Sequence, residues 1–345
     1  MIKLGRDVLI KILPSLLYFI LCTIIFIFDF NIWITGSAEY PRFYIMPIIF
    51  SLIFLIILIF LLKFIKSKRN LTTISTDVDY LNTFYLFIIY LIIIWFPRQF
   101  MIWKFGVTFE KIPILYLIVT QIVLLEGLFL TEFGLKRELL LKNILLGCLI
   151  ALITISIMTV INLVIPIAVE GSGVLSNIEL FEMSQFITFP WQLIAVGISE
   201  ELFFRGYFFT KFRKAGKSFW HSAVVSSTVF MIFHIPWLIS IEGTVNLDLP
   251  YLIWRVVNTF PLGLICCALY EKTNSLTAPI VYHGFSNSLT TFLLINIGPN
   301  YVIELTIGII AFFVLFGITF LAPWLCKLLK FEHTFGIVRN GKINE

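Results

Sequence analysis

The sequence predicts an all-α polytopic transmembrane bundle, and three observations lead to this fold class. Of the 345 residues, 59% are hydrophobic and 13% are charged, and 37 are phenylalanine. Apolar stretches of about 20 residues, the length that crosses a bilayer, follow one another along most of the chain. Lysine and arginine are concentrated in alternate connections between these stretches. The composition excludes a water-soluble globular protein, a disordered chain and a nucleic-acid-binding protein of the usual basic kind.

About ten spans are expected from uninterrupted apolar runs of membrane-crossing length. Their ranges are 10 to 30, 43 to 62, 80 to 96, 112 to 130, 143 to 168, 187 to 209, 219 to 240, 250 to 269, 276 to 296 and 302 to 325. The first run follows basic residues, as the core of a secretion signal does. Its length and the many later spans favour a first transmembrane helix.

Charges between the spans predict the orientation of the bundle. One set of connections holds most of the basic residues, namely Lys3, Arg6, Lys11, Lys63, Lys66, Lys68, Arg69, Lys136, Arg137, Lys142, Lys211, Arg213, Lys214, Lys217, Lys272, Lys327, Lys330, Arg339 and Lys342. The other set has only Arg42, Arg98, Lys104 and Lys111. By the positive-inside rule, both termini are cytoplasmic. Three basic residues in one outside connection run against the rule, and a re-entrant early span would change the count by one.

The sixth predicted span contains three ionisable residues within six positions, Glu200, Glu201 and Arg205. Each costs about 2.5 to 3.5 kcal/mol inside a span on insertion scales, so each requires a partner or a function. Glu201 and Arg205 are four residues apart and share a helix face, where they can form an ion pair. Glu200 is turned about 100° away from Glu201. This geometry predicts that Glu200 is available to act as a base.

Two histidines, His234 and His283, also lie inside predicted spans. With a rise of about 1.5 Å per residue from the nearest cytoplasmic lysine, Glu200, His234 and His283 lie roughly 16, 25 and 16 Å deep. They can therefore share one layer of the membrane. His283 and Asn287 are four residues apart and can face one point, and Phe230 can pack beside His234 for the same reason.

A carboxylate, two imidazoles and a carboxamide can together activate water and stabilise an oxyanion on a peptide carbonyl. Alternatively, Glu200, His234 and His283 can bind Zn²⁺, which lowers the pKa of bound water to about 7. The five cysteines have no CxxC or metal-finger spacing and are interpreted as small buried apolar residues. The sequence has no HExxH, GxSxG or GxGD motif and no Gly-rich phosphate loop.

Three motifs on successive spans resemble those of the CPBP family of intramembrane proteases, which includes type II CAAX prenyl endopeptidases and bacterial homologues associated with bacteriocin self-immunity. The motifs are Glu200-Glu201-x-x-x-Arg205, Phe230-x-x-x-His234 and His283-x-x-x-Asn287. The resemblance implies a helical protease core at residues 186–297. Variable accessory helices would precede it at 1–185, and a last transmembrane helix with a cytoplasmic tail would follow at 298–345.

The resemblance also implies a role for each motif. Glu200 and His234 would activate the hydrolytic water, and His283 and Asn287 would stabilise the oxyanion. Glu201 and Arg205 would support the site. The family is often called metalloprotease, but a glutamate-dependent reaction without a tightly bound metal is also argued for it, so zinc and no cofactor both stay open.

The implied substrate is a membrane-bound, prenylated or peptide-precursor protein, and the other partners are lipids, with no nucleic acid. Abundant Ile, Phe and Lys suggests an AT-rich bacterial genome, and hence a multi-pass protein of the bacterial cell membrane.

Two other function classes stay open. One is a non-catalytic bacteriocin-immunity or interaction protein. The other is a proton-coupled transporter that uses the intramembrane glutamates and histidines, although no paired broken helices are evident in corresponding halves. A purely structural polar seam is the simplest alternative, because the chain also tolerates Glu126, Arg255 and Glu304.

Overall fold

The computed structural model describes residues 78–105, 111–119, 121–122, 126–180, 189–238, 245–296, 298–331, 338–339 and 342–343. The spans predicted at 10 to 30 and 43 to 62 lie outside these residues. The elements in chain order are α3 (Tyr80–Phe105), α4 (Lys111–Val119), η2 (Leu130–Phe133), α5 (Leu140–Glu170), η3 (Ser172–Asn177), β1 (Ile178–Leu180), α7 (Phe189–Trp191), η4 (Gln192–Gly197), α8 (Ile198–Glu201), η5 (Leu202–Phe209), α9 (Thr210–Lys214), α10 (Phe219–Ile232), η6 (Ile235–Leu238), α11 (Leu249–Leu252), η7 (Ile253–Val257), α12 (Thr259–Thr273), α13 (Thr277–Ser288), β2 (Leu293–Ile295), α14 (Tyr301–Leu328), β3 (Val338–Arg339) and β4 (Lys342–Ile343). Of the η segments, η4, η5 and η7 are π-helical and the others are 3₁₀ turns.

Four helical stretches within the described residues are long and apolar enough to cross a membrane. They are Leu140–Glu170, Phe219–Leu238, Leu249–Thr273 and Tyr301–Leu328. Each coincides with a span predicted from the sequence, so the protein is a helical membrane protein. The total of about ten spans and the cytoplasmic location of both termini stay predictions.

The predicted span at 276 to 296 is wrong as a single helix. Helix α13 has 12 residues and ends at Ser288, so it is about 18 Å long against a hydrocarbon core of about 30 Å. The chain then forms β2, which pairs antiparallel with β1. Thr159 of α5 anchors this turn, since its Oγ1 accepts hydrogen bonds from the Phe292 amide at 2.8 Å and the Thr291 hydroxyl at 3.1 Å. These tertiary hydrogen bonds explain why an apolar sequence leaves the helix early.

The predicted span at 112 to 130 is also interrupted. Residue Gly127 has a φ of +70°, the left-handed region that favours glycine, so a regular helix does not continue through it. The preceding Glu126 is held by residues of the neighbouring helix. Its Oε2 lies 2.5 Å from the Lys211 Nζ, and the Tyr207 hydroxyl donates to its Oε1. An ion pair with another element thus fixes the chain at this break.

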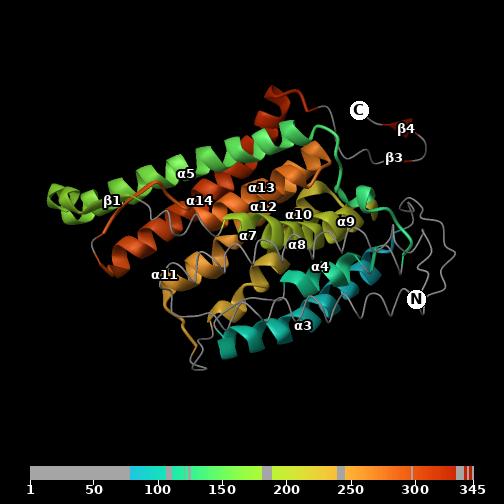
Figure 1. Ribbon diagram of the computed structural model, residues 1–345, viewed down its shortest axis with the longest axis horizontal. Helices are drawn as coiled ribbons and strands as arrows, with labels where there is room; N and C mark the ends of the chain where they lie inside the picture. Colours follow the sequence, from blue (N-terminus) through green and yellow to red (C-terminus); the bar gives the residue numbers. More distant parts are fainter. Residues whose placement is uncertain are drawn as a thin grey trace, which may run out of the picture.

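The helices form a bundle with the site-bearing segments at its centre. In Figure 1, α5 and α14 lie side by side along one side, with α12 and α13 packed against them, and α3 and α4 lie on the opposite side. A continuous helical stretch from α7 to α9 runs between these two sides. Its phenylalanines meet α3, where the Phe87 and Phe208 rings stack with centroids 4.0 Å apart. The site-bearing helix is therefore fixed by packing on both flanks.

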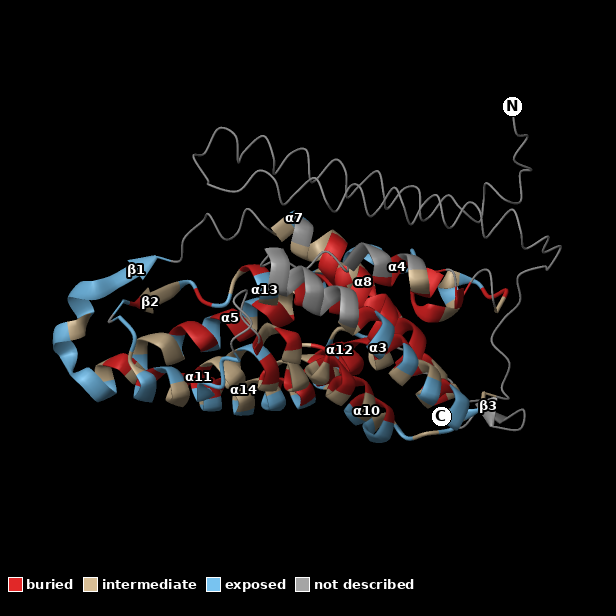
Figure 2. Ribbon diagram, turned by 90° about the horizontal axis from the view of Figure 1, so that it is seen from below, coloured by how far each residue is buried: buried red, intermediate tan, exposed pale blue. Residues whose placement is uncertain are grey.

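The outer faces of the long helices are apolar. Exposed side chains on α14 include Phe313, Phe320 and Trp324, and those on α5 include Leu145 and Leu152. Figure 2 shows exposed residues along the outer edge of the bundle and buried ones towards its middle. Such large exposed hydrophobic side chains are unfavourable in water and suit contact with lipid.

Candidate active site

Glu200 and Glu201 lie on α8, a short α-helical segment between the π-helical segments η4 and η5. A π-helical turn shifts the backbone bonding pattern and leaves carbonyls that need other donors. The Ser226 hydroxyl of α10 supplies one, donating to the Phe204 carbonyl at 3.0 Å. Segments of this kind often mark functional sites. The local backbone therefore departs from a regular helix on both sides of the two glutamates.

Glu201, Arg205 and His283 form a buried polar network. The Glu201 Oε1 lies 3.0 Å from the Arg205 Nη1, which is the ion pair expected from their spacing. The same oxygen lies 2.7 Å from the His283 Nδ1. The exposed fractions of the three residues are at most 1%. Because a carboxylate oxygen accepts, the His283 Nδ1 is the donor of this bond.

The surroundings of Arg205 are closely packed. Its Cζ lies 4.4 Å from the centroid of the Phe230 ring, a cation–π contact that stabilises a desolvated guanidinium. A Cβ placed on Gly263 of α12 would lie 2.8 Å from the Arg205 Nη2 and 2.8 Å from the Ser227 Oγ. Because Gly263 has no side chain, the Arg205 guanidinium fits between α12 and the helix that carries Glu201.

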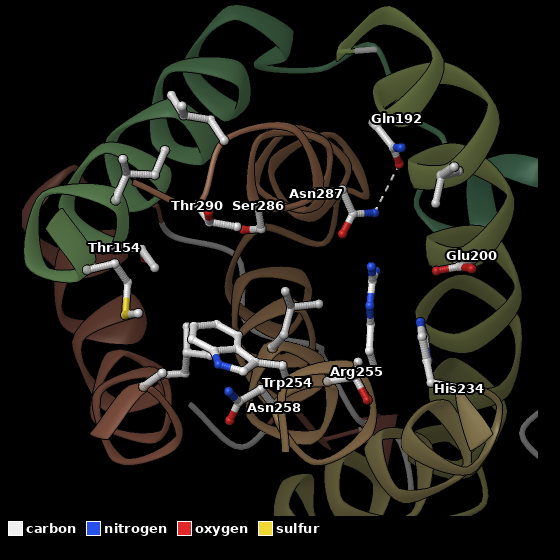
Figure 3. A pocket seen from close by; sticks show the side chains of 18 of the residues that line it. Thr154, Gln192, Glu200, His234, Trp254, Arg255, Asn258, Ser286, Asn287 and Thr290 are labelled. Atoms are coloured by element: carbon white, nitrogen blue, oxygen red, sulfur yellow. Dashed lines mark hydrogen bonds between the residues drawn. The ribbon is translucent and has the colours of Figure 1, made fainter. Parts of the chain in front are cut away.

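A cavity of about 580 Å³ lies beside this network. Its wall includes three of the residues expected to form the site, Glu200, His234 and Asn287. Figure 3 shows Glu200 and His234 on one wall, with Asn287 above them pointing towards Gln192. The Asn287 Nδ2 donates to the Gln192 Oε1 at 3.3 Å. A carboxylate, an imidazole and a carboxamide therefore border one cavity.

His283 lies between the two glutamates. Its Nδ1 contacts Glu201, and its Nε2 lies 3.6 Å from the Glu200 Oε2. Glu200 is 1% exposed, and its carboxylate borders the cavity. The imidazole of His283 thus connects the buried ion pair to the carboxylate on the cavity wall.

His234 lies in a turn, two residues beyond the end of α10. Helix α10 ends there because Pro236 has no N–H to donate to the Ile232 carbonyl and its ring clashes with that group. The His234 Nδ1 lies 2.8 Å from the Phe230 carbonyl oxygen. Since a carbonyl only accepts, Nδ1 holds the hydrogen, and the Nε2 of a neutral ring is then a hydrogen-bond acceptor.

His283 and Asn287 both lie on α13, but their surroundings differ. Asn287 is exposed and lines the cavity, whereas His283 is buried and contacts Glu201. Four residues of an α-helix turn through about 400°, so the two side chains differ in direction by about 40°. Because α13 packs between its neighbours, this difference in direction leaves the His283 side chain buried and the Asn287 side chain on the cavity wall. Of the six predicted residues, three line the cavity and three form the network behind it.

Several further polar or aromatic residues on the cavity wall had no assigned role in the sequence analysis. Among them are Gln192, Trp254, Arg255 and Asn258. Arg255 had a detectable signal, because a charge within an apolar run is costly. The other three are single residues within long apolar runs, and no motif or spacing distinguishes them.

The metal candidates do not form a metal cluster in the described part of the chain. No group of three or more His, Cys, Asp or Glu side chains there has an arrangement that could hold a metal ion. His283 directs its Nδ1 to Glu201, which leaves only Nε2 for any other ligand. The side chains described here therefore do not by themselves fit the predicted Zn²⁺ site.

The fold and the site together define an integral membrane protein with a buried Glu/Arg/His network beside a cavity. Residues 182–289 match the model of a family described as type II CAAX prenyl endopeptidase Rce1-like. The matched segment includes all six predicted site residues, and the match confirms the resemblance to the CPBP intramembrane proteases. At the level of the family, this supports a CAAX-type intramembrane protease. Among curated proteins and among solved structures, none matches the chain significantly.

Proposed function

We propose that this protein is an endopeptidase of the bacterial cell membrane that hydrolyses a peptide bond in a membrane-associated, prenylated or peptide-precursor substrate. The observation that supports this most directly is the separation of two adjacent glutamates. Glu200 borders a cavity together with His234, while Glu201 is paired with Arg205. A carboxylate beside a cavity can receive a proton from water, whereas an ion-paired one is held in its charged form.

In the proposed reaction, Glu200 takes a proton from a water molecule whose oxygen attacks the carbonyl carbon of the scissile bond. The Nε2 of His234 accepts the second hydrogen of this water and so orients it. The carbonyl oxygen becomes an oxyanion, to which the Asn287 amide donates a hydrogen bond. When the C–N bond breaks, the proton on Glu200 passes to the leaving amine.

His283 has a positioning role in this scheme. Its burial and its contacts with both glutamates support a part in orienting the Glu200 carboxylate, with Glu201 holding the imidazole in place. It lies outside the set of residues that line the cavity, so direct contact with the oxyanion is assigned to Asn287. The metal alternative has a separate test, which is the zinc content of the purified protein. Zinc bound at one ion per chain, and lost in His234→Ala, would assign the water to a metal.

The test compares Glu200→Gln with a matched glutamate variant. Glu304 is exposed on α14 and is absent from the cavity wall, so Glu304→Gln is the control. Membrane proteomes of cells with wild-type protein and with Glu200→Gln are compared to find one missing cleavage product, and its uncleaved precursor then serves as substrate in proteoliposomes. We expect cleavage by the wild type and by Glu304→Gln and none by Glu200→Gln.

Two results would contradict the proposal. If Glu200→Gln keeps the full biological effect of the wild type, the protein acts by binding, as an immunity or interaction protein does. If proteoliposomes take up a solute in response to a proton gradient and cleave no peptide, the glutamates and histidines serve a transporter.

A further inference from the structure

Arg255 occupies the cavity but has no role in the reaction described so far. It lies on η7, and its side chain lines the same cavity as Glu200, His234 and Asn287. Figure 3 shows the side chain reaching across the cavity in the direction of Asn287, on the same side as Glu200 and His234. A permanently charged group therefore points into the space in which the peptide bond would be attacked.

Two aromatic rings lie near the guanidinium of Arg255. The Arg255 Cζ lies 5.5 Å from the ring centroid of Trp237 and 5.8 Å from that of Tyr251. The Tyr251 hydroxyl donates to the Trp237 carbonyl at 3.1 Å, which fixes the two residues relative to each other. Cation–π contacts use the face of the guanidinium and leave the N–H groups at its edge able to donate in its plane.

No carboxylate forms an ion pair with Arg255 in the part of the chain that the structure describes. The basic members of the ion pairs found there are Arg205, Lys211, Arg213 and His283. The Arg255 side chain is exposed on the cavity wall. A guanidinium favours an anionic partner wherever water stabilises its charge less well than in bulk solution. In the proposed reaction, the oxyanion that forms when water attacks the peptide carbonyl is such an anionic partner.

We infer that Arg255 is a further catalytic residue, whose guanidinium donates hydrogen bonds to the oxyanion beside Asn287. This inference rests on the proposed function. His283, which the resemblance assigned to the oxyanion, is buried behind Glu200, so Asn287 alone would leave the developing charge without a counter-charge. The attacking water loses its proton to Glu200, and the carbonyl electron pair moves to the oxygen facing Arg255. In this step the guanidinium donates hydrogen bonds and transfers no proton.

The test measures kcat and KM of Arg255→Gln and Arg255→Lys in proteoliposomes, with Arg137→Gln as the control. Arg137 is exposed in the connection before α5 and is absent from the cavity wall. Removal of one oxyanion donor typically lowers kcat by about 10²-fold to 10³-fold. We expect a loss of this size for Arg255→Gln with unchanged KM, partial recovery in Arg255→Lys, and wild-type kinetics for Arg137→Gln.

One peptide is assayed both as the free acid and as the C-terminal amide, because a substrate carboxylate is the other anion that Arg255 could bind. An equal loss of kcat on both forms supports the inference. A raised KM confined to the free acid would overturn it and make Arg255 a substrate anchor. Cleavage by Arg255→Gln at the wild-type rate would overturn it while leaving the proposed function intact. Absence of cleavage by the wild type would overturn both the inference about Arg255 and the proposed function. Arg255→Lys keeps the test valid if the glutamine variant does not fold.

Discussion

His283 is hydrogen-bonded to Glu201, with 2.7 Å between the Nδ1 of the imidazole and the Oε1 of the carboxylate, and both side chains are almost inaccessible to solvent. This bond joins α13 to α8 at the centre of the bundle. His283 therefore belongs with Glu201 and Arg205 in the buried network, whereas the other three predicted site residues line the cavity. The predictions below follow from that division.

The first prediction concerns the ion pair between Glu201 and Arg205. Removing either partner leaves an uncompensated buried charge, which typically costs about 3 to 5 kcal/mol. We therefore expect Glu201→Ala and Arg205→Ala each to lower thermal stability as well as activity, while Glu200→Gln leaves stability unchanged. Thermal unfolding of the purified variants in detergent measures this. The double variant should lose less than the sum of the two single losses. Additive losses would mean that the two side chains are not coupled.

The second prediction separates the two histidines. His283 is buried and bonded to Glu201, so His283→Ala removes one partner of a charged hydrogen bond, at an expected cost of about 1 to 3 kcal/mol in stability. His234 lies in a turn on the cavity wall, so His234→Ala should reduce cleavage with little change in stability. Parallel unfolding and cleavage assays test the contrast. Equal destabilisation by the two variants would contradict the division of roles.

The third prediction concerns the space beside Arg205. A methyl group on Gly263 would approach the Arg205 Nη2 and the Ser227 Oγ to 2.8 Å, so Gly263→Ala should displace the guanidinium and reduce both stability and activity. Overpacking of this kind costs about 1 to 3 kcal/mol. The matched control is Gly317→Ala on α14, where an added Cβ meets no atom within 4 Å. Unchanged activity and unfolding temperature in Gly263→Ala would show that the contact with Arg205 is not required.

The fourth prediction concerns topology. The alternation of connections that are rich and poor in Lys and Arg indicates that the segment around Lys214 is cytoplasmic and that the segment around Ser172 is on the other side. Reporter fusions at Lys214 and Ser172, one active only in the cytoplasm and one only outside it, should therefore give opposite signals. If both sites report the same side, the number of spans between them is wrong.

Part of the site could be predicted from sequence because it depends on geometry within one helix. Residues four apart in an α-helix lie on the same face, and the Glu201–Arg205 pair follows that rule even though Arg205 lies within the π-helical segment η5. The four long spans are recognisable for a similar reason, because about 20 apolar residues in sequence suffice to specify a membrane-crossing helix. The three motifs likewise indicated the family to which residues 182–289 are similar.

Only the tertiary structure decided which of these residues share the cavity. The direction of His283 depends on how α13 packs, and that depends on contacts such as Gly284 against Leu193. The end of α13 depends on hydrogen bonds to Thr159, 132 and 133 positions away in sequence, and Arg255 reaches the site from η7, a different segment from the one that carries the glutamates. The spacing along one helix sets which side chains share a face. Contacts between segments distant in sequence decide in which direction that face points and which side chains lie opposite it. A local sequence pattern does not contain the free energy of those contacts.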